Sequence, residues 1–260
     1  MPGILLRIPY IQNKVSEVAT TQLSGHLGVP VKIGNVDIEW FNRLVLEGLY
    51  LEDQDGKVMF EANHVAAGFE IMPLLEGKFV FTTVRLFGFS FNLRKHTPES
   101  PLNLQFVIDA FASKDSIKKE KNIDLRFNSI MIRRGNFSYN VDSEKETPGK
   151  FNAKHIDIKN LSAKISLKAF NKDSVNAHIK KMSFDEASGF SLNKLSLNVV
   201  GNRDSAFVQD FEVRLPQTDL KIGRARIDLS EIDSLPALLN NAPIDLNITP
   251  SQICLKDLDR

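Results

Sequence analysis

The chain has 260 residues, 25% of them charged, and a formal net charge of +1, so no charge excess favours nucleic acid or an anionic surface as a partner. Its hydrophobic fraction of 42% is ordinary, whereas 18 Phe against one Trp and three Tyr is not. The single cysteine, Cys254, excludes an internal disulfide. The five histidines are scattered singly, without the spacing of a metal site. The length suits one elongated domain or two compact ones.

Residues 1–10 are apolar and short, with Pro2 and Pro9 framing four aliphatic residues. They are fewer than the roughly 20 apolar residues that span a bilayer, and they lack the basic start of a signal peptide. Two interpretations stay open. The segment is either the end of a membrane helix that begins upstream, or an apolar N-terminal strand.

The clearest predicted helix covers residues 11–27. Gly28 stands where a left-handed C-terminal cap belongs, and Pro30 prevents the helix from continuing. We expect this helix to cap the end of a sheet, with a membrane-surface helix as the alternative. Its apolar side chains fall near one face: Ile11, Val15, Val18, Leu23 and Leu27.

The stretch 29–53 reads as two strands, because its apolar residues alternate with polar ones. The alternation slips by one residue at 34–35 and again at 47–48. Because side chains alternate between faces, such a slip predicts a β-bulge that keeps the apolar residues on one face. The alternative is a turn between two short strands.

The same slip recurs along the chain, and a row of bulged strands is expected to curl a sheet into a trough. The run 79–95 has a slip near 86–87, followed by Gly88, which lets the backbone bend. The other slips follow Phe127, Ile158, Ile179, Leu192, Val208 and Ile222.

The expected fold is mainly β within the α+β class: a capping helix and a long, bent, twisted antiparallel sheet that forms an open apolar trough. A short second helix is expected near 102–112, with Leu104, Val107, Ile108 and Phe111 on one face. The predicted parts are 1–28 (membrane-proximal segment and capping helix), 29–112 (first β-block) and 113–260 (second β-block). Since the sequence stops inside a predicted strand hairpin, we expect the second block to be truncated at its C-terminal end.

Enzymatic motifs are missing from the sequence. It contains no GxSxG elbow, and its 14 glycines form no phosphate-binding loop. Asp53, Asp55 and Gly56 belong to a hairpin turn, because no downstream ligands complete a calcium loop. We therefore expect no catalytic residues, no metal and no cofactor, and a protein that is not an enzyme.

Several segments resemble the N-terminal region of AsmA-like and TamB-like proteins, the latter from the translocation and assembly module, in the version typical of Bacteroidota. The resemblance is strongest over residues 5–93 and covers most of the chain. The segments that carry it are LLRIPYIQNKV, LGVPVKIGNVDIEWFNRLVLEGLYLEDQDGKV, LLEGKFVFTTVRLFGFSFNL and, at the end, IDLNITPSQICLKDLD.

The resemblance implies a periplasmic protein of a Gram-negative bacterium, anchored in the inner membrane by an N-terminal helix that this sequence lacks. The rest would form a β-taco, a folded sheet with an apolar groove. Such bridge-like lipid transfer proteins are thought to carry phospholipid toward the outer membrane and so to support outer-membrane biogenesis. An Omp85-type outer-membrane barrel is the implied partner of a C-terminal region that is absent here.

The groove candidates cluster on the first bent strands, next to the capping helix. Because each slip can shift the alternation by one residue, the sequence leaves open which face of the sheet each of these side chains lies on. The rival hypothesis is a structural or scaffolding component of an envelope assembly module without lipid transport, whose sheet would bury a dry core. The candidates are Trp40, Leu44, Leu46, Phe79, Phe81, Phe89 and Phe91.

Overall fold

A computed structural model of the chain describes residues 9–39, 42–70, 81–111, 127–171, 174–228 and 243–257. The elements are, in chain order, α2 (Pro9–Leu27), β1 (Val31–Lys32), β2 (Asn35–Glu39), β3 (Arg43–Glu52), β4 (Val58–Phe69), β5 (Phe81–Lys95), α4 (Gln105–Phe111), β6 (Phe127–Val141), β7 (His155–Asn171), β8 (Ser174–Glu186), β9 (Ser191–Asn202), β10 (Ser205–Arg214), β11 (Asp219–Asp228), β12 (Ile244–Ile248) and the 3-10 turn η1 (Leu255–Asp257).

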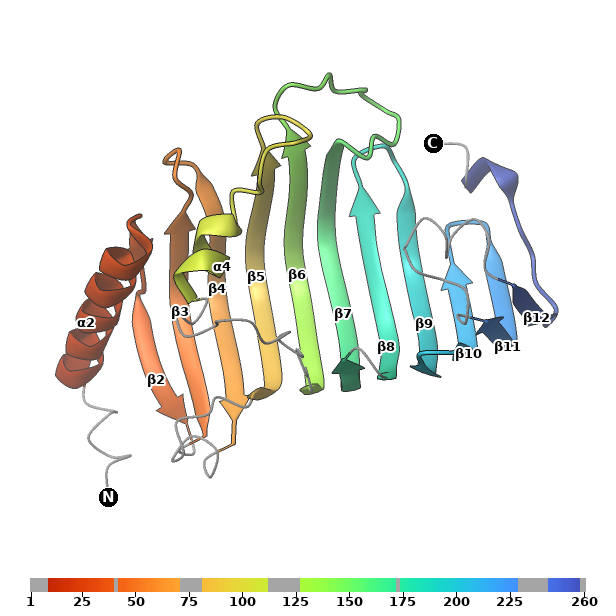
Figure 1. The fold of residues 1–260 in the computed structure, drawn as a ribbon, viewed down its shortest axis with the longest axis horizontal. Helices are drawn as coiled ribbons and strands as arrows, with labels where there is room; N and C mark the ends of the chain where they lie inside the picture. The colour runs from red at the N-terminus through yellow and green to blue at the C-terminus, as the bar shows by residue number, and fades with distance from the viewer. Residues whose placement is uncertain are drawn as a thin grey trace. The chain divides into compact units, whose positions relative to one another are not determined.

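The described strands form one 12-stranded sheet in the order β1-β3-β4-β5-β6-β7-β8-β9-β10-β11-β12, with β2 also paired to β3 (Figure 1). The order has two ends, so the sheet is open rather than closed into a barrel. The pairs β3–β4, β4–β5 and β8–β9 are antiparallel, as are the pairs from β9 to β12. This confirms the predicted fold class, a mainly antiparallel open sheet with an N-terminal helix.

The pair β5–β6 departs from the antiparallel rule. The N–H of Asp142 donates to the carbonyl of Lys95 at 2.9 Å, and that of Ser143 donates to the carbonyl of His96 at 3.0 Å. Contacts therefore advance in the same direction along both strands, and the arrows of β5 and β6 agree in Figure 1. Parallel neighbours need a crossover connection over a sheet face, and α4 belongs to this one.

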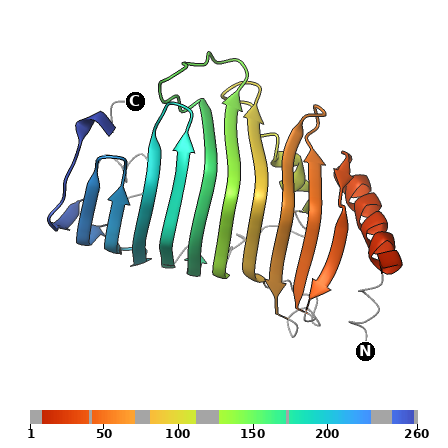
Figure 2. The same ribbon diagram turned by 180° about the vertical axis from the view of Figure 1, so that it is seen from behind.

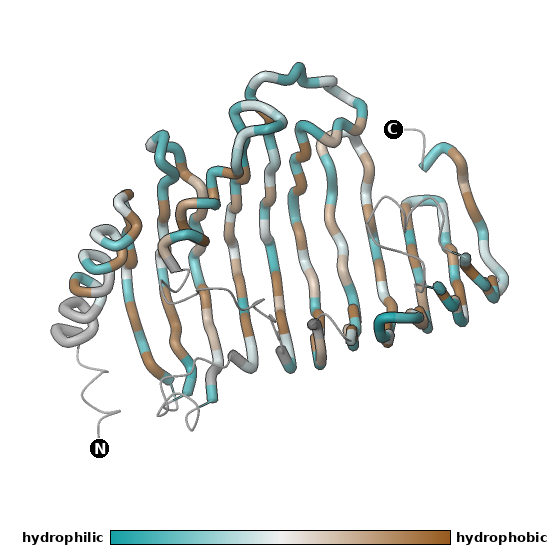
Figure 3. The backbone as a smooth tube through the Cα atoms, viewed as in Figure 1, coloured by the Kyte–Doolittle hydropathy of each residue, from teal (hydrophilic) through white to brown (hydrophobic). Residues whose placement is uncertain are grey.

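The chain divides into two compact units. Unit 1 consists of Met1–Lys119, Ile132–Leu161 and Glu186–Gly189, and unit 2 of Glu120–Met131, Ser162–Asp185 and Phe190–Arg260. Figure 3 shows how polar and apolar residues alternate along the strands of both.

Helix α2 packs on the first strands of unit 1 through its C-terminal turns. Leu23 and Leu27 contact the buried cluster of Val31, Ile33 and Val36. Figure 1 shows α2 lying alongside β2. The expectation for Val18 is corrected, because its side chain is 52% exposed.

Helix α2 ends at Leu27, as predicted, and begins at Pro9, two residues before the expected start. Gly28 has φ +70° and its N–H donates to the carbonyl of Ser24 at 2.8 Å, which confirms the left-handed cap. The Ser24 hydroxyl also accepts the N–H of Val31 at 3.0 Å. Helix and first strand are thus joined directly.

Bulges interrupt several strands where the sequence predicts them, but the slip at 34–35 is a break between β1 and β2, in line with the alternative of two short strands. Gly48, Gly88, Asn160 and Asp210 lie within strands at positive φ, between 52° and 63°. Register shifts fall between Ile179 and Met182 in β8 and between Ile222 and Arg224 in β11. In β6 the left-handed residue is Arg134, with φ 52°, rather than residue 128 or 129.

Replacing Gly88 with Ala is expected to destabilise unit 1 by about 1–2 kcal/mol, since a left-handed backbone is unfavourable for residues with a Cβ. The new Cβ would also lie 2.6 Å from Asn63 Nδ2. Gly25→Ala is the control, because Gly25 is helical and has nothing within 4 Å of its added Cβ. Urea unfolding measures both variants. Equal stability of Gly88→Ala and wild type would contradict a strained bulge at this position.

Candidate functional site

One face of the unit 1 strands is apolar across the bulges. Residues directly opposite each other in antiparallel strands share a face. Leu46 lies opposite Val65 and Val65 opposite Leu86, while Leu49 lies opposite Ala62 and Ala62 opposite Phe89. Leu44, Leu46, Leu49 and Leu51 all pack against the cluster beneath α2. The apolar face of unit 1 comprises Leu44, Leu46, Leu49, Leu51, Phe60, Ala62, Val65, Ala67, Val84, Leu86, Phe89 and Phe91.

Phenylalanines dominate the middle of this face. The ring of Phe60 lies 6.2 Å from that of Phe89 and 5.7 Å from that of Phe91. The Phe91 ring in turn lies 6.2 Å from that of Phe137 in β6. Phe89 is only 6% exposed and covers Gly135, where an added Cβ would come within 2.2 Å of the ring. The glycine therefore makes room for an aromatic side chain of the neighbouring strand.

The structure brings four of the seven candidate residues onto this one face: Leu44, Leu46, Phe89 and Phe91. Phe81 is the first residue of β5 and is paired with Phe69. Trp40 and Phe79 lie outside the described residues.

Unit 2 carries an apolar face of the same kind. Val199 lies opposite Val208 and Val208 opposite Ala225, while Phe211 lies opposite Ile222. The face comprises Val175, Ala177, Ile179, Met182, Phe184, Leu192, Leu195, Leu197, Val199, Ala206, Val208, Phe211, Val213, Leu220, Ile222, Ala225, Ile227, Ile244, Leu246 and Ile248.

Much of the unit 2 apolar face is incompletely covered. Leu197, Phe211 and Val213 are half-buried. On β12 the exposed fraction reaches 54% for Ile244 and 59% for Ile248. Soluble proteins seldom leave contiguous apolar side chains uncovered, and such surfaces commonly mark binding sites.

The opposite face of unit 2 carries charged side chains that pair with one another, and also Phe207 and Val200. Glu212 contacts Lys194 and lies 2.6 Å from Arg214, which lies 3.5 Å from Asp219. The hydrogen bond from Lys194, outweighing the effect of burial, holds the pKa of Glu212 below its usual range. On the same face, the guanidinium of Arg224 in β11 lies 4.9 Å from the centre of the Phe207 ring in β10. This face is a solvated one.

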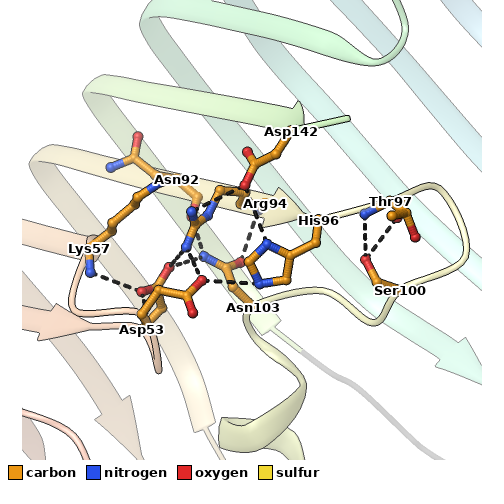
Figure 4. Close-up of polar contacts among 10 residues, drawn as sticks. Asp53, Lys57, Asn92, Arg94, His96, Thr97, Ser100, Asn103 and Asp142 are labelled. Carbon is orange, nitrogen blue, oxygen red and sulfur yellow. Dashed lines mark hydrogen bonds and ion pairs between the residues drawn. The ribbon is translucent and has the colours of Figure 1, made fainter. Parts of the chain in front are cut away.

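At one end of the unit 1 strands, a polar network joins the β3–β4 turn to the ends of β5 and β6 (Figure 4). Arg94 Nη2 lies 3.0 Å from Asp53 Oδ2, and Arg94 Nη1 lies 3.3 Å from Asp142 Oδ2. His96 Nε2 lies 3.2 Å from Asp55 Oδ2. The side chains of Asp53 and Arg94 are only 2% and 11% exposed, so this ion pair is largely buried.

Burial alone would raise the pKa of the Asp53 carboxyl, but hydrogen bonds from Asn103, from the N–H groups of Lys57 and Asp55, and from Arg94 outweigh it. The pKa therefore lies below its ordinary value, and the pKa of Glu186 is lowered similarly by Ser188 and nearby N–H groups, against the effect of burial.

We expect the free energy of unfolding to fall as the solution is acidified. A carboxyl with a lowered folded pKa contributes stability above its unfolded pKa, about 4, and that contribution is lost as pH falls through the folded pKa. Urea unfolding at pH 7, 5 and 3.5 measures this decrease. Asp53→Asn is expected to make the free energy of unfolding depend less on pH. A wild-type free energy of unfolding that does not change between pH 7 and pH 3.5 would contradict the prediction.

Neither a metal site nor a membrane-spanning helix emerges in the part of the chain that the structure describes. No group of three or more His, Cys, Asp or Glu side chains there is arranged to hold a metal ion. None of the helices described is both long and apolar enough to traverse a bilayer. The apolar faces are therefore the candidate functional site.

Comparison with models of known protein families found no match, and a search of curated proteins found none with significant similarity.

Proposed function

We propose that this chain is a module of a periplasmic, bridge-like lipid transfer protein that carries phospholipid along the apolar faces of its sheet between inner and outer membrane. The observation that carries the proposal is the unbroken apolar face of each unit, kept in phase by bulges. A sheet that needed only a stable core would not require its apolar side chains to stay aligned across every bulge while half-exposed.

The energetics favour acyl chains as the ligand. Moving a chain of about 16 carbons into water costs roughly 12 kcal/mol, at about 0.8 kcal/mol for each methylene. A face lined by Phe, Leu, Ile and Val removes most of that cost and needs no catalytic group. The polar head group stays in water beside the sheet, so selectivity rests on chain length and packing.

The sequence resemblance to AsmA-like and TamB-like proteins supports the same proposal. On the ground of this resemblance we propose that the chain lies in the periplasm, as part of a protein with an inner-membrane anchor and an Omp85-type barrel as partner. Within each unit the phospholipid would then travel across the strands.

Extraction of a fluorescent phospholipid from quenched vesicles tests the proposal. We expect a rise in fluorescence that saturates with protein concentration and is competed by unlabelled phospholipid. No rise above that given by a soluble β-protein without an apolar face would refute lipid transfer and favour the scaffolding alternative.

A further inference from the structure

The β5–β6 crossover places α4 on the side of unit 1 that α2 covers. Leu23 and Leu27 of α2 pack over the apolar face, and the neighbouring His26 reaches α4: its Nε2 lies 2.9 Å from the carbonyl oxygen of Ala110. In Figure 1 α4 is drawn in front of β4, and in Figure 2, viewed from behind, it lies behind the strands. Both helices therefore lie on the apolar side.

Helix α4 is amphipathic, with apolar side chains that are partly buried and polar ones that are exposed. Phe106, Val107 and Ala110 are half-buried, whereas Asp109 is exposed and Ile108 is 54% exposed. The predicted apolar face that included Ile108 is thus corrected. The helix also begins at Gln105 rather than 102, because Asn103 pairs with Arg94 of β5 instead of entering the first turn.

Asn103 fastens the start of this segment to the sheet. Its N–H donates to the carbonyl of Arg94 at 2.9 Å, and its Oδ1 accepts the N–H of Arg94 at 3.0 Å. Its Nδ2 donates to Asp53 Oδ2 at 3.0 Å and to the carbonyl of Asn92 at 3.1 Å. Residues 103–111, here called the strap, are therefore held at the Asn103 end by the buried network and at the other end by His26.

We infer that the strap closes the apolar face of unit 1, so that acyl chains reach that face only when the strap is released. The inference rests on the proposed function and adds a gate to it. In unit 2, by contrast, apolar side chains of β12 are exposed, 54% for Ile244 and 59% for Ile248, so we expect its apolar face to bind lipid without a gating step.

Site-specific photocrosslinking tests the gate in the full chain with phosphatidylcholine vesicles. A photoreactive amino acid replaces Leu86 or Phe91 in unit 1, and Leu197 or Val213 in unit 2. If the strap is open about one tenth of the time, labelling at the unit 1 positions is about tenfold lower. Asn103→Ala and His26→Ala are expected to raise labelling there and to speed hydrogen exchange of the amides of residues 105–111.

Asn152→Ala is the matched control, because Asn152 also bonds two backbone groups, those of Lys145 and Lys154, in a turn outside the strap. It is expected to leave the labelling ratio unchanged. Equal labelling of both units in the wild type, or no gain in either strap variant that retains the wild-type circular dichroism spectrum, overturns the gate and keeps lipid binding. No labelling at any position refutes the proposed function, and the gate falls with it.

Discussion

Phe211→Asp is expected to remove most of the phospholipid bound by unit 2, whereas Phe207→Asp leaves it unchanged. Both residues are on β10, but they lie on opposite faces: Phe211 is opposite Ile222 on the apolar face, and Phe207 is opposite Arg226 on the polar face. A carboxylate among acyl chains loses its hydration without gaining a partner, which is costly. At position 207, Arg224 and Arg226 are both within reach of a carboxylate.

The measurement is the amount of phospholipid extracted with organic solvent per mole of purified protein. A cost above about 1.4 kcal/mol reduces binding by more than about tenfold in Phe211→Asp. Both variants replace the same residue type on one strand, so loss of bulk hydrophobicity affects them equally. If both variants lose lipid to the same extent, the apolar face is not the binding surface.

Arg94→Met is expected to lower the free energy of unfolding by about 3–5 kcal/mol, the range found when one partner of a buried ion pair is removed. The Asp53 carboxylate, 2% exposed, would keep its N–H and Asn103 partners but lose its counter-charge. Asp55 and Asp142 would lose the same cation. Urea unfolding of the purified variant gives the change.

Arg43→Met provides the comparison. Arg43 pairs with Glu39 at 3.1 Å, but the two side chains are 33% and 39% exposed, and exposed pairs contribute only about 0–1 kcal/mol. A loss in Arg94→Met as small as that in Arg43→Met would mean that the network at the end of unit 1 is held by backbone hydrogen bonds alone.

The bulges were predictable because they leave a local signature. At several places where two non-apolar residues separate apolar ones, as at Lys159–Asn160 and Gln209–Asp210, the strand keeps its apolar residues on one face by a bulge. The fold class and the existence of an apolar face could be predicted from this slipped alternation of apolar residues. Phe87 marks its limit: the alternation suggests one face for Phe87, Phe89 and Phe91, yet Phe87 lies opposite His64, on the other face from Leu86 and Phe89.

Features that depend on residues distant in sequence could not be predicted. The β5–β6 parallel pairing has no local signal, since the crossover reads as an ordinary loop and short helix. The network around Arg94 joins residues 41 and 48 positions away, and each carboxylate alone resembles a turn residue. Arg134 adopts a left-handed backbone that arginine does not favour, so its position in β6 gives no warning of a bulge.

Native mass spectrometry of the purified wild-type chain tests lipid binding by the apolar faces. We expect adducts with the masses of membrane phospholipids that survive gel filtration, that dissociate as intact lipids on activation, and that are absent from Phe211→Asp. A wild-type spectrum containing only the mass of the bare chain, from protein purified without detergent, would contradict lipid binding by these apolar faces.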